Sequence, residues 1–119
     1  MARTRVDLQP VRNMTGNYIQ PANEAARVGA NRNGVVFVNV FKVQATPNVV
    51  IAIESATDAA LGDATGTSYW QTVGSVSTIN AAGVYRFTIT DLADLIRFRT
   101  SSIASEFSFS IVVFLNDQA

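Results

Sequence analysis

Few side chains in this sequence have the types and spacing that chemistry requires, and the clearest group of them is acidic. Glu54, Asp58 and Asp63 lie close together along the chain. Carboxylates so placed could ligate calcium, and Glu54 with Asp58 could form the carboxylate pair of a glycosidase. Their spacing matches no calcium-binding loop, and nothing places two of them across a cleft. We therefore expect a solvated loop here, with no metal.

Other chemistry is limited by what the composition omits. The sequence contains no histidine and no cysteine, and Lys42 is its one lysine. This excludes Ser-His-Asp arrangements, cysteine nucleophiles and thiolate metal sites within these residues. The glycines at 29 and 34 are spaced as in a phosphate loop, but no Lys-Ser or Lys-Thr pair follows, so a turn is expected. The sequence predicts a protein that is not an enzyme and that binds no cofactor.

The charged residues favour protein partners. Nine basic residues balance nine acidic ones, so no net charge attracts nucleic acid or a membrane surface, and neither is expected as a partner. Eight of the nine basic residues are arginine, which is enriched at protein interfaces where lysine is depleted. Residues 1–34 carry a net charge of +3, from five arginines and two acids. We expect partner contacts from these arginines and the one aromatic among them: Arg3, Arg5, Arg12, Tyr18, Arg27 and Arg32.

The elements that position these residues are predicted to be strands. From residue 34 onward, β-branched and aromatic residues recur in short runs that are separated by turn signals. The predicted strands cover 35–44, 49–55, 69–79, 84–90, 95–100 and 106–115. Alternation places Ile96 and Phe98 inward, and Arg97 and Arg99 outward. The predicted fold class is all-β: a single antiparallel β-sandwich, jelly-roll-like, over residues 34–119.

Residues 1–33 have a different character. They are poor in large apolar residues and follow no sustained period of 2 or 3.6 residues, apart from one short helical turn predicted around 23–27. We expect an extended N-terminal arm that lies across neighbouring subunits. On this expectation, the sandwich folds without the arm.

Two predicted strands, at 35–44 and 106–115, are apolar on both faces and so carry more apolar residues than one core requires. A sandwich strand normally alternates apolar and polar residues. The surplus predicts a second packing surface for self-association, although the protein's own loops could also cover it. The residues expected there are Val36, Val38, Val40, Val112 and Phe114.

About half of the chain carries a resemblance to a known type of protein. Its features are the aliphatic strand 51–55, the Trp-bearing stretch 69–74, the Ala-Ala-Gly turn before the strand at 84–89, and Leu-Ile-Arg-Phe-Arg at 95–99. In this order they resemble the small β-sandwich proteins of tailed-bacteriophage structural gene clusters, including head decoration (cement) proteins. Similar sandwiches also serve as carbohydrate-binding modules.

The resemblance implies a function. A protein of this type is made in the host cytoplasm and ends on the virion. There it decorates and stabilises the capsid by binding the outer surface of the major capsid protein, often as a homotrimer at three-fold positions. The alternative is a carbohydrate-binding or host-attachment module that uses exposed aromatics such as Tyr69 and Trp70.

Overall fold

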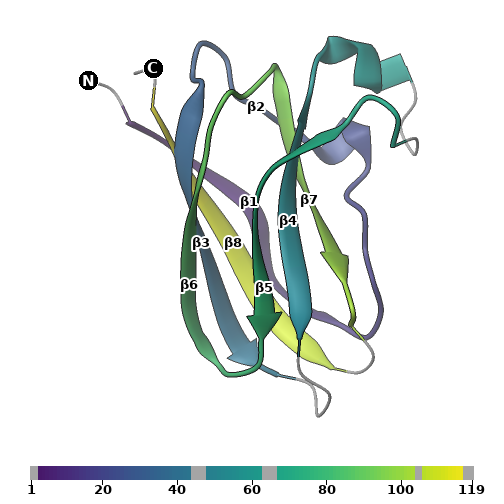
Figure 1. Ribbon diagram of the computed structural model, residues 1–119, viewed down its shortest axis with the longest axis vertical. Helices are drawn as coiled ribbons and strands as arrows, with labels where there is room; N and C mark the ends of the chain where they lie inside the picture. The colour runs from purple at the N-terminus through teal and green to yellow at the C-terminus, as the bar shows by residue number, and fades with distance from the viewer. Residues whose placement is uncertain (1–2, 44–47, 63–66, 104–105, 117–119) are drawn as a thin grey trace.

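A computed structural model describes residues 3–43, 48–62, 67–103 and 106–116, with the side chain of Arg3 excepted. Two four-stranded antiparallel sheets pack face to face (Figure 1). Sheet A has the order β1-β8-β3-β6, and sheet B has the order β2-β7-β4-β5. The strands of sheet A are β1 (Arg3–Met14), β8 (Phe107–Asn116), β3 (Asn33–Lys42) and β6 (Gly83–Ile89). Those of sheet B are β2 (Ala26–Arg27), β7 (Leu95–Ser101), β4 (Val49–Ala56) and β5 (Gln71–Ile79).

This arrangement is that of a jelly roll, with eight strands in two sheets, and it confirms the predicted all-β sandwich. Two short 3-10 helices, η1 (Ala22–Glu24) and η2 (Asp58–Gly62), lie together at one end (Figure 1). The helical turn expected around 23–27 is found only in part, because η1 follows Pro21 and ends at Glu24, and Ala26–Arg27 form β2. Within the described ranges, no helix is both long and apolar enough to cross a membrane.

The core lies between the sheets and follows the alternation of the strands. Every second residue of β8, from Phe107 to Leu115, has a buried side chain. Phe98 of β7 meets Phe109 edge to face, with ring centroids 5.9 Å apart, and so joins the two sheets at the centre. Val49, Ile51 and Ile53 of β4 complete this layer and are fully buried.

Residues 3–33 are not an arm outside the sandwich, which corrects the expected boundary at residue 34. β1 pairs with β8 from Arg3–Asn116 to Met14–Phe107 and forms an edge of sheet A. Leu8 and Met14 on β1, and Val28 after β2, join the core. The polar composition misled the prediction because an edge strand needs apolar residues on one face only, and two register shifts interrupt the alternation of β1.

Candidate interaction surface

The outer face of sheet A has an apolar centre. Val35 and Phe37 on β3, and Val112 and Phe114 on β8, point away from the core and are half-buried. The rings of Phe37 and Phe114 meet edge to face, with centroids 5.7 Å apart. The exposed side of an antiparallel sheet is normally polar, so this centre is a candidate contact surface.

The structure divides the residues that were predicted to self-associate. Val36, Val38 and Val40 point into the core and are at most 3% exposed, so that part of the prediction is wrong. Their neighbours of opposite parity, Val35 and Phe37, lie on the outer face instead. Val112 and Phe114 do lie on the outer face, as the surplus of apolar residues predicted.

Charged and exposed side chains border this apolar centre on both sides. On β1, Arg5 Nε lies 3.1 Å from Asp7 Oδ1, and both side chains are exposed. On β6, alternation turns Val84, Arg86 and Thr88 outward, and all three are exposed. A hollow of about 260 Å³ lies beside Val112, where β1 bulges away from β8; Pro10, Val11 and Ser110 also line it.

The arginines predicted to bind a partner have contacts within the chain. Arg27 Nη1 donates to Asp58 Oδ1 at 2.8 Å. Arg32 Nη1 donates to the carbonyl oxygens of Gly29 and Asn31 at 2.9 and 2.8 Å. These contacts are exposed, so binding to a neighbouring subunit stays a prediction for them. The side chain of Arg3 lies outside the part that the structure describes.

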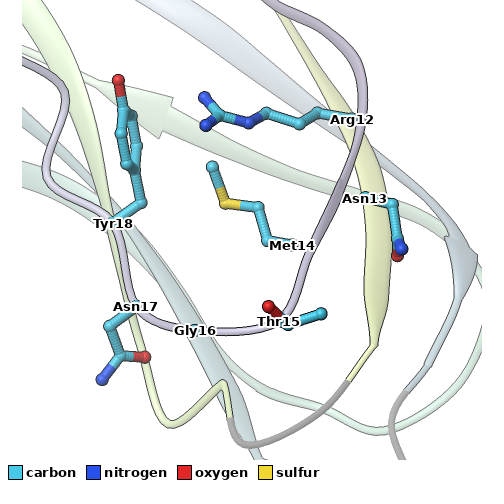
Figure 2. Close-up of a pocket in the computed structure, with 7 residues that line it drawn as sticks. All are labelled: Arg12, Asn13, Met14, Thr15, Gly16, Asn17 and Tyr18. Atoms are coloured by element: carbon cyan, nitrogen blue, oxygen red, sulfur yellow. The ribbon is translucent and has the colours of Figure 1, made fainter.

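Arg12 and Tyr18 are brought together at a pocket of about 250 Å³ in the turn that follows β1 (Figure 2). The Arg12 guanidinium carbon lies 4.5 Å from the centre of the Tyr18 ring. Asn17, which also lines the pocket, fixes the turn, because its Oδ1 accepts the backbone N–H of Ile103 at 2.8 Å. A guanidinium stacked on a ring in such a pocket is suited to a carbonyl or carboxylate of a partner protein.

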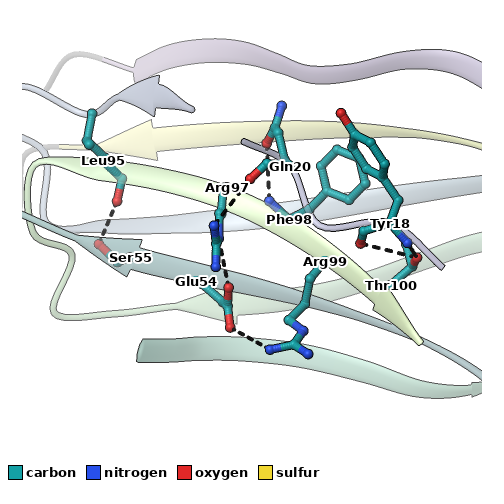
Figure 3. Close-up of polar contacts among 9 residues, drawn as sticks. All are labelled: Tyr18, Gln20, Glu54, Ser55, Leu95, Arg97, Phe98, Arg99 and Thr100. Carbon is teal, nitrogen blue, oxygen red and sulfur yellow. Dashed lines mark hydrogen bonds and ion pairs between the residues drawn. The ribbon is translucent and has the colours of Figure 1, made fainter. Parts of the chain in front are cut away.

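Figure 3 shows a buried polar cluster where the segment after β1 covers sheet B. Arg97, which was expected to face outward into solvent, is fully buried. Its Nε donates to Glu54 Oε1 at 2.8 Å, and its Nη1 donates to the carbonyl oxygen of Gln20 at 3.3 Å. Arg99 Nη1 donates to the other oxygen of Glu54 at 3.4 Å. The alternation of β7 was right, but a segment of the chain lies over this face and excludes water from Arg97.

Two of the three acidic side chains considered for chemistry are held in ion pairs. Two arginines bind the Glu54 carboxylate, and Arg27 binds Asp58, while Asp63 lies outside the described residues. Among the residues that the structure describes, no three acidic side chains gather as a metal site. Trp70 is buried, with its ring 4.2 Å from the Arg97 guanidinium carbon, so it cannot stack on a sugar. Of the two aromatics proposed for glycans, only Tyr69 is exposed.

Sequence reasoning missed Asp7 and Arg86, which border the outer face. Alternation in 84–90 does place Arg86 outward. What the sequence lacks is the register between strands, which decides which side chains lie next to one another.

Comparison with known proteins gives structural neighbours only. No protein-family model matches the chain, and no curated protein is similar to it in sequence. A chain from the structure titled "Bacillus endospore appendages form a novel family of disulfide-linked pili" is 15% identical, with a TM-score of 0.51 over 99% of this chain and 93% of that one. The SPBc2 prophage-derived protein YomS is 18% identical, with a TM-score of 0.50 over 95% of this chain and 93% of that one. At such identities the likeness shows a shared fold.

Proposed function

We propose that this chain is a structural protein that works by binding other proteins and not by catalysis. The observation that carries this proposal is the apolar centre on the outer face of sheet A, made by Val35, Phe37, Val112 and Phe114. Contiguous apolar surface bordered by polar residues is typical of protein contact sites. The neighbours support it by analogy of fold, because one is a pilus chain and the other a prophage-derived protein.

In its specific form, the proposal is that the protein decorates and cements a bacteriophage capsid. It binds the outer surface of the major capsid protein and resides on the virion. The resemblance of residues 49–99 to decoration proteins supports this assignment. The pocket at Arg12 and Tyr18 is the proposed contact with the shell, since both residues face it and Arg12 is exposed.

The test uses particles. Virions from a strain that carries the gene are purified on a density gradient, and the protein is sought in them by mass spectrometry. We expect it at a fixed ratio to the major capsid protein. Particles made without the gene should lose their DNA at a lower temperature, and added protein should restore the higher one. Raising the salt concentration should weaken binding if arginine pairs contribute.

A variant locates the contact. Arg12→Glu reverses the charge at the pocket and should reduce binding to particles that lack the protein. Asn80→Glu, at an exposed position outside the pocket, is the control and should leave binding unchanged. Absence of the protein from purified virions, together with failure of the added protein to bind them, would contradict the cement function.

A further inference from the structure

The strand register arranges the outer face of sheet A in rows that run across all four strands. One row is Asp7 on β1, Val112 on β8, Phe37 on β3 and Arg86 on β6. The next row is Arg5, Phe114, Val35 and Thr88. In the first row, two apolar residues thus lie between an acid at one edge of the sheet and a base at the other.

We propose that a second copy of this chain packs face to face on this surface, about a two-fold axis parallel to the strands. This inference rests on the proposed function, since it names the partner of the same surface. Rotation about such an axis keeps each row in place but exchanges the β1 edge with the β6 edge. Asp7 then faces the partner's Arg86, and Arg86 faces the partner's Asp7. Sheets that pack face to face keep their strands roughly aligned, which this arrangement satisfies.

The charges at the two edges are available for this contact. The side chain of Asp7 is 59% exposed and forms an ion pair with Arg5 on the same strand. Arg86 is exposed and forms no ion pair with any residue that the structure describes. A carboxylate accepts more than one hydrogen bond, so Asp7 can bind both arginines.

The shape of the face is complementary to itself in the same arrangement. A third row joins Ser110 on β8, Asn39 on β3 and Val84 on β6. Ser110 lies in the hollow of about 260 Å³ beside β1, whereas Val84 is 66% exposed on β6. The two-fold axis places Val84 of each copy opposite the hollow of the other. The exposed apolar side chain and the hollow therefore cover each other.

The size of the face predicts a weak dimer. Four strands about 4.8 Å apart, each about eight residues long at ~3.3 Å per residue, present roughly 500 Å². Two copies would bury about 1,000 Å², at the lower end of specific interfaces, so we expect a weak and reversible dimer. A face-to-face contact of this kind is closed by two copies, unlike the trimer that the resemblance implies.

Charge reversal on the purified full-length chain tests the proposal. Analytical ultracentrifugation of the wild type up to about 1 mM should show a reversible monomer–dimer equilibrium. Asp7→Arg places two arginines together at each edge of the contact, and Arg86→Asp places two acids together there. Each variant should therefore self-associate at least about tenfold more weakly than the wild type. An equimolar mixture of the two variants forms a mixed dimer with an opposite-charge pair at both edges and should associate more strongly than either variant alone.

Arg86→Lys, which keeps the charge, is the matched control and should retain the dimer. Circular dichroism of each variant checks that it is folded, and both substituted positions are exposed. A wild type that stays monomeric, a trimeric mass, or a mixture that associates no better than its components would overturn the proposal. This assay uses only the purified chain, so its failure is separate from failure to find the protein on virions.

Discussion

At the scale of single residues, Arg97 shows how the chain accommodates a charge in its interior. Its guanidinium bonds to Glu54, to the carbonyl oxygen of Gln20 and to the face of Trp70. Each contact comes from a different part of the chain, so the arginine holds the segment after β1 on sheet B. Removing one partner of a buried ion pair leaves the other charge without compensation in a place that water does not reach.

Glu54→Ala is therefore expected to lower the free energy of unfolding by about 3–5 kcal/mol, as measured by urea denaturation. The chain offers a matched control in Asp58→Ala, which breaks the exposed ion pair with Arg27 and should cost at most about 1 kcal/mol. Similar losses for the two variants would show that the buried cluster contributes no more than a surface pair.

At the scale of elements, β5 and β6 approach each other closely at Gly74. A Cβ placed at this glycine would lie 2.7 Å from the carbonyl oxygen of Thr88 and 2.8 Å from Cγ2 of Ile89. β5 is the edge of sheet B and β6 is the edge of sheet A, so the sandwich closes here by backbone against backbone. Any side chain at position 74 must push the two sheets apart at this edge.

Gly74→Ala should destabilise the fold by about 1–3 kcal/mol, the usual range for overpacking. Gly16→Ala is the control, because nothing lies within 4 Å of a Cβ there, and its effect should stay within about 0.5 kcal/mol. Thermal unfolding of both variants, followed by circular dichroism, gives the comparison. Equal melting temperatures would mean that β5 and β6 can move apart at position 74 without a loss of stability.

How far the sequence predicts the fold depends on the element. The strands from residue 33 onward follow from their alternation, because one face of each must meet the core. β1 does not, since Pro10 and two register shifts interrupt its pattern. The candidate surface could be predicted only in part. Val112 and Phe114 follow from the surplus of apolar residues in their strand. The row that contains Asp7 and Arg86 does not, because it depends on the register between strands, which the connecting turns and loops determine.

At the scale of the whole molecule, residues 3–33 are part of the sandwich. β1 provides one edge of sheet A, and the segment around Gln20 and Ala22 covers sheet B. Leu8, Met14 and Val28 contribute to the common core. From this placement we predict that the sandwich does not fold without this part of the chain.

Deletion of residues 2–30 is expected to abolish cooperative thermal unfolding, because β8 loses a neighbour and the core loses its cover. Leu8→Ala keeps the chain intact and should cost about 2–5 kcal/mol, so the claim can be tested even if the truncated chain is insoluble. A truncated protein that melts cooperatively at the wild-type temperature would show that the remaining residues fold as a complete domain and that the segment is not needed for stability.

The place of β8 in sheet A has a consequence for the order in which the molecule is made. β8 follows the other seven strands along the chain, yet it lies between β1 and β3. Synthesis proceeds from the N-terminus, so β1 emerges from the ribosome before the other seven strands and can pair only when β8, the eighth, has followed. Pairing Arg3 with Asn116 closes nearly the whole chain into one loop, and such distant contacts make folding slow. A nascent chain that stops before Phe107 offers β1 no neighbour, so sheet A is completed only after translation has passed β8.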